Sequence, residues 1–166
     1  MTRSVKLLAE IDGAALGALA RRYAVDVAWL PAGADIPGSY WGAPEAGLVA
    51  RRLFVRPDTP LHSALHELSH FVCMPPKRRA TLYRDAGGDA FEECAVCYLQ
   101  VLLADMLPGC SSAALLEDMD VWGYSFREGS AARWFIGDGA DARAWLLGHE
   151  LVTASSSPTW RLRGFS

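Results

Sequence analysis

Apolar residues recur with the 3.6-residue period of an amphipathic helix over residues 61–73. On a helical wheel of about 100° per residue they occupy one arc; they are Leu61, Ala64, Leu65, Leu68, Phe71 and Val72. Thr59 suits the N-cap, Pro60 suits the first helical position, and Pro75-Pro76 ends the pattern. The pattern predicts a helix with its back in the core and its polar face in a cleft.

A second helix is predicted over residues 89–107, which are apolar on almost every side and are followed by Pro108-Gly109. Two glutamates lie near its start. Glu92 shares its side of the wheel with apolar residues, whereas Glu93, about 100° away, shares its side with Gln100. The helix is expected to be buried and to carry its acidic residues at one end.

The rest of the pattern predicts further helices and short strands. Helices are expected over residues 5–23, from Ser111 or Ser112 to Met119, and over residues 140–151; strands over residues 25–29 and 47–55; and a turn-rich loop over residues 36–44. The fold class is therefore expected to be α+β, with a few-stranded sheet packed on helices.

Composition limits the classes of protein that the chain can represent. It has 166 residues, of which 51% are hydrophobic and 21% charged, and a net charge of −3. A single domain is expected over residues 1–152, followed by a linker-like tail, residues 153–166, that is flexible or docked. The charge predicts no nucleic-acid partner. No signal peptide or membrane span is recognisable, so a cytoplasmic location without a membrane partner is expected.

The sequence His66-Glu67-Leu68-Ser69-His70 places candidate chemistry on the polar face of the first helix. Residues four apart lie on one side of a helix, so His66 and His70 can bind one Zn²⁺. Glu67, next to the first histidine, can then act as general base on a water molecule. His62 lies one turn earlier, about 12 Å along the helix from His70, and is expected to be a cleft-wall or first-turn residue.

A catalytic zinc ion usually has a third protein ligand, and the second helix offers one. Glu92 is the preferred ligand, because a carboxylate against an apolar face needs a cation. Two alternatives stay open: Asp89 and Glu92 could form a capping box, and Glu93 could be the ligand instead. His149 is a more distant candidate.

These motifs resemble the gluzincins, whose H-E-x-x-H is followed by a glutamate on a second helix, and most closely the small ImmA/IrrE-type metallopeptidases. The resemblance covers roughly residues 47 to 109 and includes Glu92-Glu93-Cys94-Ala95 and Met106-Leu107-Pro108. It implies a small zincin-like, minimal gluzincin fold and one Zn²⁺ per chain on His66, His70 and Glu92. It also implies hydrolysis of a peptide or protein substrate with Glu67 as catalytic base, by an endopeptidase rather than an exopeptidase.

The chain departs from that family at Val96, where relatives carry a polar residue after the alanine, so another group must orient a ligand histidine. No helix-turn-helix segment is recognisable, so the role of some relatives in cleaving a repressor is not carried over. Three residues are candidates for stabilising the oxyanion, namely Tyr124, His149 and Tyr83. The alternative function is a zincin-fold binding or regulatory module with little or no turnover.

An arginine pair and a cysteine pair are two further candidates for a functional role. Arg51-Arg52 could steer an acidic substrate, but a solvated strand edge protected by charge is the favoured interpretation. Cys94-x-x-Cys97 lies inside an apolar helix without a second cysteine pair nearby, which favours free thiols over a metal or redox site.

Overall fold

The computed structural model describes residues 4–83 and 86–165, and within them the chain has a mixed α+β fold. The described residues form seven α-helices, a single turn of 3₁₀ helix, η1, and a three-stranded sheet. The helices are α1 Gly13–Arg21, α2 Leu61–Cys73, α3 Pro76–Arg79, α4 Ala90–Ala104, α5 Ser112–Trp122, α6 Ala131–Ile136 and α7 Gly139–Gly148. The expected fold class is confirmed at this level.

The sheet has the order β1-β3-β2, with β1 Asp26–Trp29, β2 Gly47–Val49 and β3 Arg52–Val55. Strand β1 runs parallel to β3, and β2 runs antiparallel to it. The prediction of one strand over residues 47–55 was therefore wrong, because a tight turn divides the segment. Ala50 occupies the left-handed region in that turn, with φ of 50°, and its N–H bonds to the Leu82 carbonyl at 3.1 Å.

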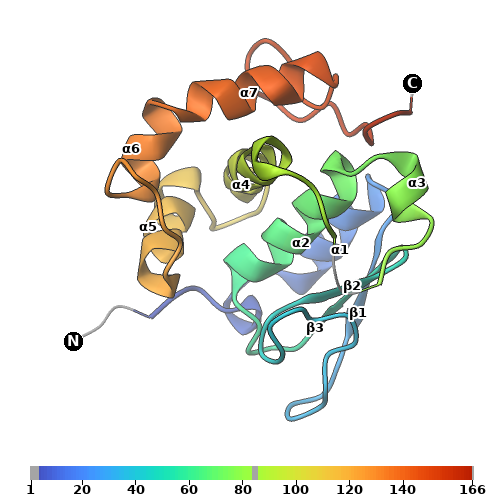
Figure 1. The fold of residues 1–166 in the computed structure, drawn as a ribbon. Helices are drawn as coiled ribbons and strands as arrows, with labels where there is room; N and C mark the ends of the chain where they lie inside the picture. The colour runs from blue at the N-terminus through green and yellow to red at the C-terminus, as the bar shows by residue number, and fades with distance from the viewer. Residues whose placement is uncertain (1–3, 84–85, 166) are drawn as a thin grey trace.

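Helix α2 is the centre of the molecule, with the sheet on one side and α4 on the other (Figure 1). Helix α4 in turn lies between α2 and α7, while α5 and α6 close one end. Nearly the whole of α2 is buried, His66 and Glu67 being half-buried. The two helices predicted to carry the site thus pack directly on each other, and the apolar arc of α2 lies in the core as expected.

The N-terminal segment differs from the single helix predicted over residues 5–23. Residues Leu8–Glu10 form the 3₁₀ turn η1, and α1 begins only at Gly13. Asp12 is the N-cap of α1: its carboxylate accepts hydrogen bonds from the N–H groups of Ala14 and Ala15 at 3.0 and 3.2 Å. A capping carboxylate satisfies N–H groups that have no partner within the helix, so it sets the start of the helix here.

The helix boundaries are otherwise close to the predicted ones. Helix α2 begins at Leu61 with Pro60 as the N-cap, because the Thr59 hydroxyl instead accepts from the N–H of Arg56 at 2.9 Å. Helix α5 is capped by Ser111, as predicted, and ends in a left-handed Gly123 rather than at Met119. The short helix α3 follows α2 closely and begins at Pro76.

The C-terminal tail lies against the domain up to the last described residue, Phe165. The N–H of Arg163 donates to the Val72 carbonyl at 2.9 Å. Earlier in the tail, Trp160 contacts Tyr23, with ring centroids 5.2 Å apart, and the Arg22 guanidinium lies 3.6 Å from the Trp160 ring centre. Of the two expectations for the tail, the docked arrangement is the one observed. None of the described helices combines the length and hydrophobicity that a bilayer crossing requires.

Candidate metal site

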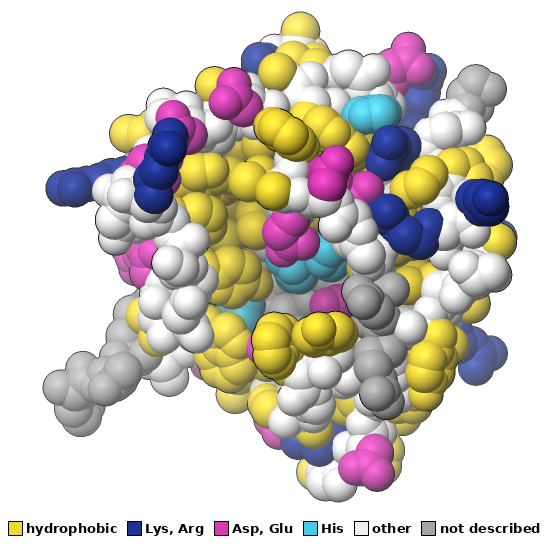
Figure 2. Space-filling model, in the orientation of Figure 1, with side chains coloured by type: hydrophobic (Ala, Val, Ile, Leu, Met, Phe, Trp, Pro, Cys, Tyr) yellow, Lys and Arg dark blue, Asp and Glu magenta, His cyan; other side chains and the backbone are white. Residues whose placement is uncertain are grey.

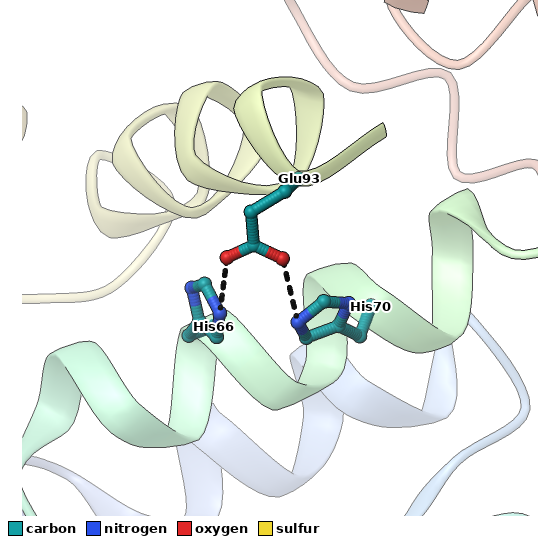
Figure 3. Close-up of side chains that lie close together, drawn as sticks. All are labelled: His66, His70 and Glu93. Atoms are coloured by element: carbon teal, nitrogen blue, oxygen red, sulfur yellow. Dashed lines mark ion pairs between the residues drawn. The ribbon is translucent and has the colours of Figure 1, made fainter. Parts of the chain in front are cut away.

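Two histidines of α2 and one glutamate of α4 meet at a single point (Figure 3). His66 Nε2 lies 3.1 Å from Glu93 Oε1, and His70 Nε2 lies 3.2 Å from Glu93 Oε2. The three donor atoms all lie within 4.8 Å of one another. Figure 3 shows the carboxylate reaching down from α4 between the two imidazole rings. The spacing of four residues thus turns both rings to the same side of α2, as the sequence predicted.

This donor set could hold a metal ion. Two imidazole nitrogens and one carboxylate are the ligands found in catalytic zinc sites of the His₂Glu type. Ligands about 2.0–2.1 Å from a tetrahedral ion lie roughly 3.3 Å apart, and the two histidine–glutamate distances, 3.1 and 3.2 Å, are close to that value. The residues present therefore fit Zn²⁺ in ligand type, and one donor atom from each lies within 4.8 Å of the other two.

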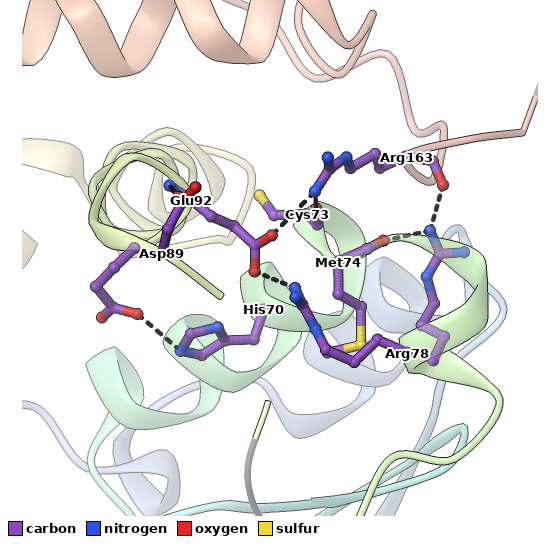
Figure 4. A network of polar contacts seen from close by, with 9 residues as sticks. His70, Cys73, Met74, Arg78, Asp89, Glu92 and Arg163 are labelled. Atoms are coloured by element: carbon purple, nitrogen blue, oxygen red, sulfur yellow. Dashed lines mark hydrogen bonds and ion pairs between the residues drawn. The ribbon is translucent and has the colours of Figure 1, made fainter. Parts of the chain in front are cut away.

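The preference for Glu92 as the third ligand is corrected by this arrangement. Glu92 is 4% exposed and makes ion pairs with Arg78 of α3 and Arg163 of the tail (Figure 4). The distance from Arg163 Nη1 to Glu92 Oε1 is 2.9 Å. A carboxylate on the apolar side of α4 does need a cation, but two guanidinium groups supply it. Glu93, on the more polar side, faces the histidines and keeps half of its side chain exposed.

Half of the capping box that the sequence allows between Asp89 and Glu92 is present. Asp89 is the N-cap of α4, and its carboxylate accepts from the Glu92 N–H at 2.9 Å. The Glu92 side chain does not reach back, because it is held by the arginines. Gly88, with φ of +100°, lies so close to this carboxylate that a Cβ there would collide with it. The loop before α4 therefore requires glycine at this position.

Gln100 orients His66, the first histidine of the candidate site. Its Oε1 lies 2.6 Å from His66 Nδ1, and its Nε2 donates to the His62 carbonyl at 3.1 Å and to the Tyr124 hydroxyl at 3.4 Å. These contacts fix the amide so that Oε1 accepts the Nδ1 proton, which leaves His66 Nε2 facing Glu93 and available as the atom that would bind a metal ion. Gln100 is fully buried. It lies one turn beyond Val96 and can take over the orienting role that Val96 lacks.

The second ligand histidine is held differently. His70 Nδ1 is buried and has no hydrogen-bond partner among the described residues. Its ring instead packs edge-on against the ring of His66, with centroids 4.6 Å apart. Of the two histidines, His66 is therefore the one whose Nδ1 has a polar partner among the described residues.

Electrostatics differ sharply between the two carboxylates of the site. Burial acts to raise the pKa of Glu93, but the hydrogen bonds and charges of His66 and His70 outweigh it and hold the pKa well below its usual range. Burial raises the pKa of Glu67, with the two imidazoles opposing and Glu45 and Glu93 reinforcing the shift. Glu93 therefore suits a permanently charged ligand, and Glu67 suits a group that exchanges a proton.

Of the three candidate oxyanion groups, only Tyr124 lines the pocket that contains the triad, among the residues the structure describes. Its hydroxyl lies 3.2 Å from His62 Nδ1, and burial raises its pKa. His149 instead stacks on Trp145 at the end of α7, with ring centroids 4.1 Å apart. Tyr83 is exposed and forms a strand-like bridge with Val49.

His62 lies in the first turn of α2, one of the two places expected for it, and is buried behind the pocket rather than forming its wall. Its ring packs between Trp122 and Tyr124, with centroid distances of 5.1 and 5.4 Å. Burial, with a smaller contribution from His66, lowers the pKa of His62 to about 3. His62 is therefore neutral at physiological pH and supports Tyr124 from behind.

The remaining sequence candidates lie outside the site. Arg51 and Arg52 are exposed and do not line the pocket; the Arg51 side chain donates to the Ala24 carbonyl at 3.0 Å. Cys94 and Cys97 are free thiols on α4, the first exposed and the second buried.

Comparison of the chain with protein-family models, with curated proteins and with solved structures found no match. The candidate function therefore depends on the geometry of the site itself.

Proposed function

We propose that the chain is a zinc-dependent peptidase in which His66, His70 and Glu93 hold one Zn²⁺ and Glu67 is the general base. The observation that carries the proposal is the meeting of both imidazoles with Glu93 in a pocket that Glu67 also lines. Zinc bound there would polarise the scissile carbonyl and activate a water molecule. The resemblance of the motifs to gluzincins supports the same function, with the ligand assigned to the second residue of Glu92-Glu93.

In this mechanism Glu67 accepts a proton from the attacking water and passes it to the leaving amine. Burial raises the pKa of Glu67 towards neutral pH, and a group whose pKa lies near the working pH can both accept and return a proton. Its place one residue after His66 keeps it next to the ligands. No other carboxylate in the described pocket combines that position with a raised pKa.

Tyr124 is proposed to stabilise the negative charge that develops on the carbonyl oxygen. His62 Nε2 is buried without a partner among the described residues, so the favoured tautomer has its proton on Nδ1, because a buried N–H without an acceptor is rare. The Tyr124 hydroxyl then accepts from both His62 and Gln100. Its own proton is left to donate to the substrate.

The arrangement of α2, α4 and the small sheet supports a zincin-like fold of minimal gluzincin type. Helix α2 carries the two histidines and the base, and α4 packs across it with the third ligand. The pocket is a surface hollow with histidine and acidic side chains at its floor (Figure 2). Such a hollow can admit an extended chain, so the proposed activity is that of an endopeptidase on a peptide or protein.

The decisive experiment compares wild type with Glu67→Gln after loading with zinc. Both proteins are expected to contain one zinc per chain by elemental analysis, while only wild type hydrolyses fluorescently labelled casein. Removal of zinc by a chelator should abolish the wild-type activity, and readdition should restore it. Undiminished hydrolysis by Glu67→Gln would disprove the assigned base, and one zinc per chain without any wild-type hydrolysis would favour a binding or regulatory module.

A further inference from the structure

The pocket that contains the triad has an acidic and aromatic lining beyond the residues already given a role. Its volume is about 550 Å³, enough for a few residues of a peptide. Three carboxylates line it, those of Glu45, Glu67 and Glu93, and none of the described lining residues is lysine or arginine. Figure 2 shows acidic and histidine side chains in the hollow and hydrophobic side chains around its rim.

Glu45 is the carboxylate that neither the metal site nor the proton transfer uses. Its Oε1 accepts a hydrogen bond from the indole N–H of Trp122 at 2.7 Å, which fixes the group on the pocket wall. That partner is neutral, and Glu45 forms no ion pair with lysine or arginine within residues 4–83 and 86–165.

Aromatic side chains line the same pocket as this carboxylate. Trp41 is 78% exposed and packs edge-on against Tyr40, with ring centroids 4.9 Å apart. Trp122, held by Glu45, is also partly exposed. The face of an indole attracts a cation, and the attraction is stronger when the pair is removed from water. A carboxylate with indole rings nearby is thus a suitable environment for an ammonium or guanidinium group.

We propose that the pocket binds peptides with a lysine or arginine side chain beside the bond to be cleaved, with Glu45 as the specificity-determining residue and Trp41 and Trp122 as its aromatic walls. This inference rests on the proposed peptidase function and names the substrate class. An acidic side chain would be repelled by the Glu45 carboxylate, whose charge no described lining lysine or arginine compensates. An apolar side chain would desolvate Glu45 without compensating its charge, which costs free energy.

The test measures binding, so that it does not depend on turnover. Zinc-loaded Glu67→Gln is titrated into three fluorescein-labelled peptides of the form Ala-Ala-X-Ala-Ala, in which X is lysine, norleucine or glutamate, and anisotropy is recorded. The lysine peptide is expected to bind about tenfold more tightly than the norleucine peptide, and the glutamate peptide more weakly than both. Adding Glu45→Gln should remove the preference for lysine.

Two further variants separate a specific effect from a general one. Glu150→Gln makes the same chemical change on an exposed residue at the end of α7, outside the pocket, and is expected to retain the full preference for lysine. Trp41→Leu should weaken binding of the lysine peptide by about two- to fivefold. Folding of each variant is checked by its circular dichroism and urea midpoint.

Each outcome decides the inference independently of catalysis. Equal binding of the lysine and norleucine peptides, a preference for glutamate, a lysine preference that persists in folded Glu45→Gln, or no binding of any peptide would overturn it. The casein assay on wild type decides the peptidase function separately. A protein that cleaves casein without selectivity for basic residues would retain the proposed function and lose only the proposed substrate class.

Discussion

Gln100 offers the sharpest test of the site, because one buried side chain holds a ligand histidine, a backbone carbonyl and Tyr124 together. The substitution Gln100→Leu keeps most of the volume and removes every polar contact. His66 Nδ1 then loses an acceptor at 2.6 Å and the His62 carbonyl loses a donor at 3.1 Å. The His66 ring would be free to change its tautomer and orientation, so Nε2 would no longer be held towards Glu93.

The expected loss can be stated for two quantities. Loss of a group that orients a ligand histidine typically weakens metal affinity by about 10- to 100-fold, which corresponds to about 1.4–2.8 kcal/mol at 1.4 kcal/mol per tenfold. The free energy of unfolding of the metal-free protein should also fall, by about 1–3 kcal/mol, because buried polar groups are left without partners. Competition with a chromophoric zinc chelator measures the first quantity and urea unfolding the second.

Two other variants make the result interpretable. Gln100→Glu keeps an acceptor for His66 Nδ1 but loses the donor to His62, so zinc affinity should be retained while stability falls. Ser69→Ala removes a buried hydroxyl of α2 that has no partner among the described residues, and zinc affinity should not change. If folded Gln100→Leu bound zinc within about twofold of wild type, where 10- to 100-fold is expected, the orienting role of Gln100 would be refuted.

Three more predictions follow from the same site. Glu93→Gln should weaken zinc binding by at least about tenfold. Glu92→Gln should keep one zinc per chain but lower the free energy of unfolding by about 3–5 kcal/mol, because it breaks a buried ion-pair cluster. The opposite pattern by elemental analysis and urea unfolding would restore Glu92 as the ligand. Tyr124→Phe should lower kcat by about 10²- to 10³-fold with unchanged zinc content, and an unchanged kcat would remove the tyrosine from the mechanism. His62 has a pKa of about 3 in the folded chain against 6.5 in the unfolded chain, so the unfolded state binds more protons between pH 3 and pH 6.5. The free energy of unfolding should therefore fall as the pH drops from 6.5 towards 3, by on the order of 4 kcal/mol at pH 3. His62→Gln should reduce this dependence in urea unfolding at a series of pH values, and an identical pH profile would contradict the cause assigned here.

The parts of the site that could be predicted from the sequence are those set by local geometry. The spacing of His66 and His70 fixes the direction of both rings as soon as the segment is helical, and the apolar arc of α2 fixes which side faces the core. The wheel also placed Glu93 and Gln100 together on the more polar side of α4. That pairing is a signal for Glu93 as the third candidate ligand and for Gln100 as the residue that orients His66, and the preference for Glu92 runs against it.

The choice of Glu92 failed because its cations come from distant parts of the chain. The apolar side of α4 was correctly expected to demand a positive charge, but Arg78 and Arg163 are 14 and 71 residues away. Nothing in a single helical pattern can place such partners. Contacts of this range depend on the path of the whole chain, which also brings the tail back to the end of α2.

The incorrect secondary-structure predictions have local causes. Residues 47–55 carry a continuous strand-like pattern, and the turn at Ala50-Arg51 lacks the glycine or asparagine that usually marks a left-handed position. The segment from residue 5 to 23 has helical periodicity throughout, but Asp12-Gly13 is a capping signal within it. In the first case a tertiary hydrogen bond to Leu82 decides the structure; in the second a recognisable cap was outweighed by the apolar pattern.

The double-arginine cluster around Glu92 has a consequence for how the protein can be handled. Its ion pairs join α4 to α3 and to the tail, and α2 packs directly on α4, so these elements are held together by contacts that involve no metal ion. In small zinc-folded domains, by contrast, chelation unfolds the chain. Removal and readdition of zinc should therefore be reversible here. Other divalent ions could be added to the folded metal-free protein, so that the affinities of the site for different ions are compared without a contribution from refolding.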